Sequence, residues 1–332
     1  MIKRVAIIND LKEMLILTLG DIESRSGLFI TSIDGLGPVK STINMTELAT
    51  QDGSRYNSAR SPYRNIVINL RHIGFDPEES RQITYRYFPL KGHVIFEIET
   101  DHRHVYIDGY VESNEPDIFS PAESSTISIL CPQPWFYSGW IEGKDVINAI
   151  PYFTVVDETA IFHYDTPPTT GRYVDNGDIL VEFGNTTPKF EFPVSFELGE
   201  GVEFSVYEDS KEGNVYYEGD VETGITMYID AYGEFTNPTI YNRSTRESLS
   251  IDTSKIPDGI LYGDRIIINT VKGNKTITLL RNGLETNIIN ALDKDADWFT
   301  LRSGDNVFAY VADTGVNNMY FSIMHRRLYG GI

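Results

Sequence analysis

The sequence predicts a mostly β protein of two domains. The chain has 332 residues, which exceeds one domain of roughly 100–200 residues. Its 20 Tyr and 17 Phe, together with frequent Val, Ile and Thr, favour strands over helices. Several segments alternate apolar and polar side chains with the two-residue period of a half-buried strand. These observations together predict β-sheet architecture around at least one sizeable core.

The first part of the chain carries the signals of one helix. Asp76 can cap free N–H groups, Pro77 suits a first helical turn and Glu79 holds the capping-box position. The helix is expected to end near Tyr87, because Pro89-Leu90-Lys91-Gly92 reads as a turn. Ile83 and Tyr87 are four residues apart and would share its buried face.

Strand signals surround this helix. Residues 66–70 form an apolar strand candidate, and residues 126–131 form another that ends at Pro132. Between them, alternation over 94–99 and the apolar residues 105–107 flank a short polar turn, which predicts a hairpin over 93–111. We therefore assign residues 1–138 to a first domain.

The second part of the chain predicts a β-sandwich or jelly roll over residues 186–332. Phe190, Phe192, Val194, Phe196 and Leu198 alternate with polar residues, as in a half-buried edge strand. Turn residues recur every 8–12 positions between short strand candidates. We expect these strands near 225–229, 240–241, 265–268, 276–280, 307–311 and 319–324, with a hairpin turn at 272–275. Residues 139–185 are expected to form a linker or an insertion of uncertain structure.

The charge of the chain limits its partners. With 28 basic and 48 acidic residues, the net charge is −20, which opposes binding to nucleic acid and to anionic membranes. No apolar run approaches the ~18 residues of a membrane span, and we expect no signal peptide. Cys131 is the single cysteine, so no intrachain disulfide forms. We expect synthesis in the cytoplasm.

Two patterns resemble metal-binding motifs, and neither is complete. His102 and His104 lie two apart near a turn, but no third ligand is close in the sequence. Asp293, Asp295 and Asp297 imitate the start of a calcium loop, although the positions for glycine and the closing glutamate hold other residues. We interpret both as polar surface turns and predict no metal site.

Catalytic patterns are equally incomplete. Glu97 and Glu99 are paired carboxylates, but they share one strand face rather than facing each other across a cleft, and we expect them on its solvent side. Cys131 falls in an apparent core strand. The sequence has no G-x-S-x-G, P-loop or G-x-G-x-x-G, and Gly35-Leu36-Gly37-Pro38 is interpreted as a tight turn. We predict no catalytic residue, no cofactor and no enzyme activity.

Aromatic residues of the second domain offer an alternative in carbohydrate binding. Trp298, Tyr232 and Tyr241 are possible sugar platforms, although packing into the core is the more common use of strand aromatics.

Several segments form a recognisable set in their order along the chain. In the first domain they are 30–37, 51–56, 64–70, 87–92, 100–112, 115–120 and 131–136. In the second domain they are 219–224, 237–242, 263–268, 298–301, 304–306 and 326–332. This ordered set resembles the distal tail protein family of long-tailed bacteriophages, the siphophage tail component family.

The resemblance implies a β-sandwich-like N-terminal ring domain, with one helix and a projecting hairpin, that closes a hexameric ring. It implies a galectin-like C-terminal β-sandwich over 186–332. The ring would join the tail tube to the tail hub or tail-associated lysin at the distal end of the virion, and the outer domain would contact receptor-binding proteins or host glycans. A galectin-like fold does not by itself imply sugar binding, so a carbohydrate-binding adhesion protein remains the alternative.

Two mechanistic expectations follow. The hairpin over 93–111, or another N-terminal edge, would link neighbouring copies by strand addition. An acidic lumen would let DNA pass without specific binding.

Overall fold

The computed structural model describes residues 1–17, 27–47, 49, 52–73, 76–120, 122–138, 178–183 and 211–332, and the backbone of short strands at 152–156, 159–163, 172–173, 185–188 and 205–208. Contacts divide the chain into two compact units, Met1–Glu142 with Leu328–Ile332, and Gly143–Arg327. The predicted fold class, mostly β, is confirmed, and the described residues contain a single α-helix.

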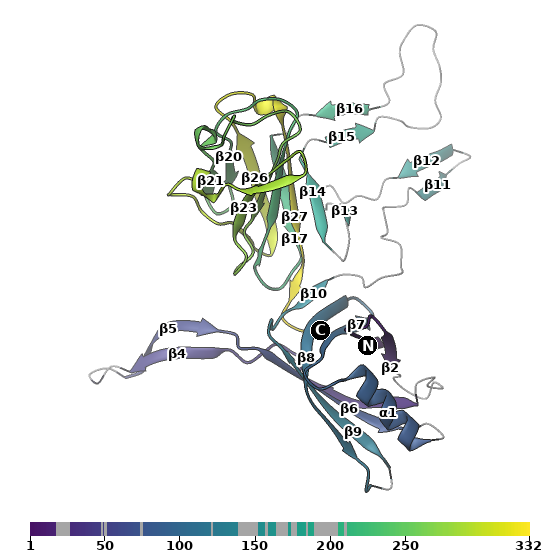
Figure 1. Cartoon of the computed structure of the whole chain (residues 1–332). Helices are drawn as coiled ribbons and strands as arrows, with labels where there is room; N and C mark the ends of the chain where they lie inside the picture. The colour runs from purple at the N-terminus through teal and green to yellow at the C-terminus, as the bar shows by residue number, and fades with distance from the viewer. Residues whose placement is uncertain are drawn as a thin grey trace. The chain divides into compact units, whose positions relative to one another are not determined.

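The first unit is built on one antiparallel sheet with the strand order β2-β1-β7-β8-β9-β6-β3 (Figure 1). Alternation explains its core, since Val94, Phe96 and Ile98 of one strand are all fully buried. Two short strands join the sheet off this path, where β10 pairs with both β8 and β28. The strands are β1 (Ile2–Asn9), β2 (Met14–Leu17), β3 (Leu28–Asp34), β6 (Arg64–His72), β7 (His93–Thr100), β8 (His104–Asp117), β9 (Ser124–Cys131), β10 (Phe136–Ser138) and β28 (Leu328–Tyr329).

The predicted helix is α1 (Pro77–Tyr87). The Asp76 carboxylate caps it by accepting from the backbone N–H groups of Glu78, at 2.9 Å, and Glu79. Thr84 is the most buried residue of its inner face, while Ile83 and Tyr87 pack half-buried on the same core. The helix contacts β1, β6 and β8.

A two-stranded arm, β4 (Thr42–Glu47) and β5 (Ser54–Arg60), lies between β3 and β6 in the sequence. Its strands pair only with each other, and every one of their residues is exposed. Figure 1 shows the arm extending away from the sheet of its own unit.

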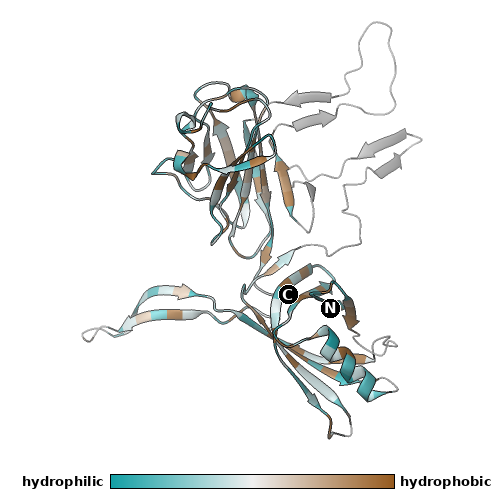
Figure 2. Ribbon diagram, in the orientation of Figure 1, coloured by the Kyte–Doolittle hydropathy of each residue, from teal (hydrophilic) through white to brown (hydrophobic). Residues whose placement is uncertain are grey.

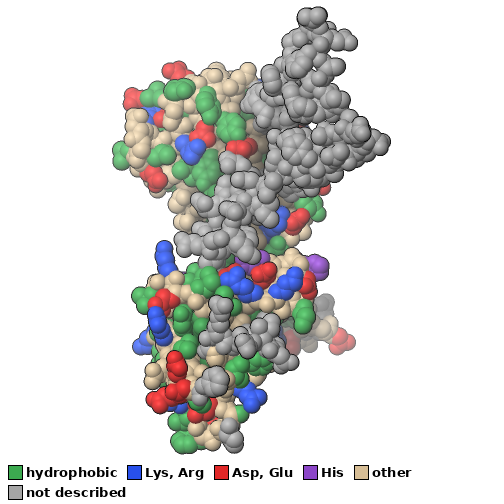
Figure 3. Space-filling view, turned by 90° about the vertical axis from the view of Figure 1, so that its right-hand side faces the viewer, with side chains coloured by type: hydrophobic (Ala, Val, Ile, Leu, Met, Phe, Trp, Pro, Cys, Tyr) green, Lys and Arg blue, Asp and Glu red, His purple; other side chains and the backbone are tan. Residues whose placement is uncertain are grey.

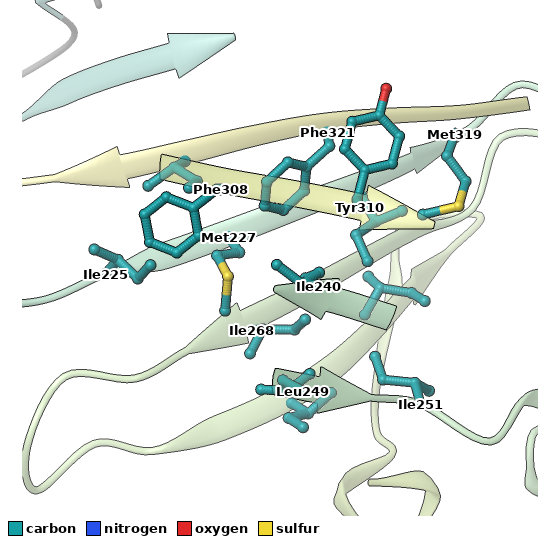
Figure 4. Packing of buried hydrophobic residues seen from close by; sticks show 14 of the residues in the cluster. Ile225, Met227, Ile240, Leu249, Ile251, Ile268, Phe308, Tyr310, Met319 and Phe321 are labelled. Atoms are coloured by element: carbon teal, nitrogen blue, oxygen red, sulfur yellow. The ribbon is translucent and has the colours of Figure 1, made fainter. Parts of the chain in front are cut away.

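The second unit is a sandwich of two antiparallel sheets, ordered β13-β14-β27-β19-β22-β23-β24 and β17-β26-β20-β21. Residues from both sheets bury one shared core, with Phe308 and Tyr310 meeting Phe321 and Met227 (Figure 4). Hydropathy follows the same alternation along the strands in Figure 2. The long sheet holds β13 (Arg172–Tyr173), β14 (Ile179–Glu182), β19 (Thr226–Ala231), β22 (Arg265–Asn269), β23 (Thr276–Arg281), β24 (Leu284–Asn287) and β27 (Met319–His325). The short sheet holds β17 (Glu212–Tyr217), β20 (Thr239–Asn242), β21 (Glu247–Ser250) and β26 (Gly304–Val311).

Smaller elements complete the second unit. They are the pairs β11 (Tyr152–Val156) with β12 (Thr159–His163), β15 (Asn185–Pro188) with β16 (Ser205–Glu208), and β18 (Thr223–Gly224) with β25 (Thr300–Leu301), and the 3-10 turns η2 (Thr253–Lys255), η3 (Ile289–Ala291) and η4 (Val316–Asn318). The strand expected over Phe190–Leu198 lies outside the described residues.

The domain limits differ from the predicted ones at two places. Residues 328–332, expected in the second domain, belong to the first unit, because β28 pairs with β10 through Phe136 with Tyr329 and Tyr137 with Leu328. The strands described between residues 152 and 182 group with the second unit. A galectin-like identity for the second unit stays a prediction.

Candidate assembly surface

The hairpin over 93–111 lies inside the sheet, so our prediction that it offers a free edge is wrong. It forms as β7 and β8, with Val105 paired to Ile98. On its other side, β8 pairs with β10 through Val105 and Ser138 and with β9 further along. Alternation predicts the strands correctly but carries no information about which strands lie beside them.

The strands at the two edges of this sheet are β2 and β3. On β2, Met14 and Ile16 expose 38% and 53% of their surface. On the other side, β3 pairs with β6, and the arm prolongs this hairpin outward. The two edges of the first unit therefore present different surfaces.

The arm has one apolar face. Ile43 pairs with Ala59, and Met45 pairs with Tyr56, so these four side chains share a side. A register shift between Asn44 and Met45 makes this possible, because without it Asn57 would oppose Met45. Ile43, Met45 and Tyr56 expose 53%, 54% and 61% of their surface.

The other face of the arm is polar. Thr42 opposes Arg60, Asn44 opposes Ser58, and Thr46 opposes Arg55. The Asn57 amide of the bulge also donates to the Thr46 hydroxyl at 2.6 Å. A two-stranded ribbon is at best marginally stable in water, and an exposed apolar face of this kind marks an interaction surface.

Arg64 anchors the root of the arm. Its Nη1 donates to the carbonyl oxygens of Gly35 and Gly37, the latter at 2.7 Å, on the segment that leads into the arm. Nε donates to the Pro134 carbonyl at 2.8 Å and Nη2 to the Gly330 carbonyl at 2.6 Å. The side chain is 1% exposed, and its burial lowers the pKa of the guanidinium.

Local packing explains the sequence around Arg64. The guanidinium carbon lies 4.4 Å from the centre of the Phe136 ring. Gly35 has φ +87°, and a Cβ there would meet the Asn65 carbonyl oxygen at 2.1 Å, so only glycine fits the predicted tight turn. Sequence reasoning missed the role of Arg64, because nothing in a strand pattern distinguishes a buried arginine from an exposed one.

The histidine pair expected in a surface turn is divided between two environments. His102 is exposed, whereas the His104 Nε2 contacts the Glu97 carboxylate, and Arg4 Nη1 lies 3.7 Å from the same oxygen. Glu97 is only 2% exposed, so our expectation that it faces solvent is wrong: long neighbouring side chains cover it. Glu99 on the same strand is half-buried.

The aspartates over 293–297 are part of a structural turn. Asp297 accepts from the Ser248 backbone N–H at 3.1 Å, and the Asp293 N–H donates to the Ser250 carbonyl. The described part of the chain holds no cluster of three or more ligands that could bind a metal.

A serine, a histidine and a glutamate do meet in the first unit. His72 Nε2 lies 3.0 Å from the Ser125 hydroxyl, and His72 Nδ1 lies 3.9 Å from a Glu123 oxygen. Ser125 is 1% exposed, so its hydroxyl is not accessible to a substrate in the folded protein. The same burial lowers the pKa of His72. Burial likewise raises the pKa of the Cys131 thiol to about 12, which excludes it as a nucleophile in the folded protein.

The three aromatics considered as sugar platforms have different surroundings. Trp298 packs half-buried on the core, with Lys275 Nζ 5.1 Å from its ring centre. Tyr232 is 64% exposed and meets Tyr320 edge-on. Tyr241 is 41% exposed and lines a groove on the short sheet.

These features define a protein of two β units with an amphipathic arm whose two strands pair only with each other. Residues 218–327 match the family model of the siphovirus-type tail component, C-terminal domain. This match lies in the second unit and confirms there the resemblance to the phage distal tail protein family.

Two solved structures are similar to this chain over nearly its whole length, and the first of them has the same fold. The Dit protein of phage SPP1, described as a paradigm of the hub adsorption apparatus in phages that infect Gram-positive bacteria, matches with a TM-score of 0.58 at 11% identity, over 98% of this chain and 99% of that one. A chain of the phage P2 baseplate, in its activated conformation with Ca, matches with a TM-score of 0.44 at 12% identity, over 98% of both chains. No curated protein matches the sequence.

Proposed function

We propose that this chain is a distal tail, or baseplate hub, protein that forms a homohexameric ring at the distal end of the phage tail. The ring joins the tail tube to the tail-tip hub or tail-associated lysin and to the receptor-binding apparatus, and the chain is made in the cytoplasm of the host bacterium. The family match supports a place in the tail. The observation that supports ring formation is the apolar face of the arm. Within the described part of one chain, no residue covers this face.

The two edges of the first unit suit a closed ring. Head-to-tail assembly requires each copy to present a donor surface and a different acceptor surface. The arm extends the β3 edge, and the opposite edge strand β2 exposes Met14 and Ile16. In the proposed ring the apolar face of the arm covers an apolar surface of the next copy, and β2 is the acceptor that offers one.

The charge of the chain supports passive passage of DNA. Proteins bind DNA largely because their basic residues displace counterions from the phosphates. A chain with a net charge of −20 gains little from this effect and repels the phosphates instead. Figure 3 shows acidic and basic side chains interspersed on the described part of the face turned to the viewer. An excess of basic residues on the lumen wall of a reconstructed ring would contradict this part of the proposal.

The proposed role requires no catalysis. Among the described residues, Ser125 and Cys131, the two candidate nucleophiles, are both buried. No helix in the described part is long and apolar enough to cross a membrane. Turnover of host cell wall by the pure chain in a zymogram would contradict a purely structural role.

Mass photometry of the purified full chain tests the ring directly. We expect a species of about six times 37.6 kDa. Met45→Ser with Tyr56→Ser removes apolar side chains from the arm and should shift the chain to monomers, and Ile16→Ser on the acceptor should weaken the ring. Arg55→Ser is the matched control, because Arg55 precedes Tyr56 but lies on the polar face.

Two results would overturn the proposal. One is a parent chain that stays monomeric at micromolar concentrations. The other is a hexamer that the arm substitutions leave intact while circular dichroism shows an unchanged fold.

A further inference from the structure

The outer surface of the short sheet in the second unit is hollowed. A groove of about 440 Å³ lies over β20, β26 and the turn that links β20 to β21. Tyr241 pairs with Ala309 across β20 and β26, and Val311 follows Ala309 on the same face. The small Ala309 side chain leaves room beside the Tyr241 ring. The floor of the groove is therefore an exposed aromatic ring next to short apolar side chains.

The rim of the groove is polar and rigidly built. The Asn242 side-chain oxygen accepts from the backbone N–H groups of Ser244, at 3.1 Å, and Thr245, at 3.3 Å, which fixes the turn. Arg246 follows with a left-handed φ of 63°, and the side chains of Arg246 and Glu247 line the groove. Position and conformation of the rim are thus set by the fold before any ligand arrives.

The groove offers both donors and acceptors without a net charge. Arg243 lines it and pairs with Glu212 at 2.6 Å, while Glu247 accepts from the Thr245 hydroxyl at 2.6 Å and keeps further acceptor capacity. Within the described residues, the Arg246 guanidinium makes no hydrogen bond or ion pair. Glu247 in the groove and Glu212 beside it offset the charges of the two arginines, so the site does not select for an anion.

We propose that this groove binds a neutral saccharide. The apolar C–H face of a sugar ring stacks on Tyr241, because aromatic side chains combine a large apolar surface with defined geometry. Its hydroxyl groups both donate and accept, which matches Glu247 and Arg246 side by side. An acidic peptide would use the arginines but would leave Glu247 facing like charge.

Saturation-transfer NMR on the full chain tests the proposal. The probes are four neutral disaccharides (lactose, maltose, cellobiose and sucrose), with glucuronic acid and an oligoglutamate peptide as comparators. We expect transfer to at least one disaccharide. Tyr241→Ala should weaken its binding by about tenfold or more, and Arg246→Gln by a smaller factor, whereas Tyr241→Phe keeps the stacking ring and should bind.

Tyr232→Ala is the matched control, because Tyr232 is an exposed tyrosine of the same unit that does not line the groove. No transfer to any of the disaccharides would overturn the proposal, and so would binding that Tyr241→Ala leaves unchanged. Oligoglutamate binding that Arg246→Gln abolishes and Tyr241→Ala spares would identify a protein partner instead. Mass photometry of the same samples reports the ring separately, so this test and the ring test fail independently.

Discussion

Replacing Arg64 with methionine tests whether one buried side chain holds the root of the arm. Methionine keeps much of the length of arginine but removes the donors to the carbonyl oxygens of Gly35, Gly37, Pro134 and Gly330. Each buried hydrogen bond contributes about 1 kcal/mol net, so four of them contribute about 4 kcal/mol. A domain is stable by only about 5–15 kcal/mol, and the variant first unit would therefore be close to unfolding.

Hydrogen exchange followed by mass spectrometry measures this loss unit by unit. Amides in β6 and β9 that exchange only when the first unit opens report its free energy of unfolding. A loss of about 4 kcal/mol in that free energy should make them exchange about a thousandfold faster. The second unit, Gly143–Arg327, serves as an internal control and should keep its protection. Arg71→Met is the external control, since Arg71 lies exposed on the same strand. Protection of the first unit within about fivefold of the parent protein would refute the reasoning, because it would mean that the four carbonyls find other partners.

Three further outcomes follow from buried groups and the returning chain end. Truncation after Arg327 removes β28 and the carbonyl oxygens of Gly330 and Gly331 that accept from Arg64 and Arg103. Calorimetry should then show a lower melting temperature for the first unit and an unchanged one for the second. An unchanged melting temperature of the first unit would contradict this. Because the pKa of Cys131 is about 12, a maleimide at pH 8 should leave the native thiol unmodified and label it in denaturant; rapid native labelling would show that it is accessible. Burial lowers the pKa of His325 from 6.5 to about 4, so below pH 6.5 the unfolded chain binds a proton that the folded chain does not. The free energy of unfolding, measured by urea titration, should therefore be highest above pH 6.5 and fall by about 3 kcal/mol towards pH 4. His325→Gln should reduce this dependence on pH, and an unchanged dependence in the variant would refute the prediction.

Local signals in the sequence predicted the elements well. The helix begins where Asp76 and Pro77 indicate, because capping depends on residues adjacent in the chain. The turn at 272–275 joins β22 to β23 for the same reason. These features involve backbone groups only a few residues apart, which a sequence displays directly.

Features that depend on distant partners were not predictable. The hairpin over 93–111 lies in the middle of its sheet because β1 and β9 pair on either side of it, and alternation is the same for central and edge strands. The arm was missed because a bulge changes which residues face together, placing Tyr56 rather than Asn57 opposite Met45. The groove beside Tyr241 depends on Ala309, which is 68 positions away and pairs with it only in the folded sheet.

Arg64 connects the arm of the first unit with the chain segment that returns to this unit after Arg327. Its guanidinium bonds the segment entering the arm through Gly35 and Gly37, and it bonds the segment returning from the second unit through Gly330. A carbonyl lost from either segment leaves a buried charged donor without its acceptor, which costs more than the bond itself contributes. The placement of the arm is therefore coupled to the return of the chain through β28. For this reason Arg64→Met should weaken the proposed ring even though every residue on the apolar face of the arm is retained.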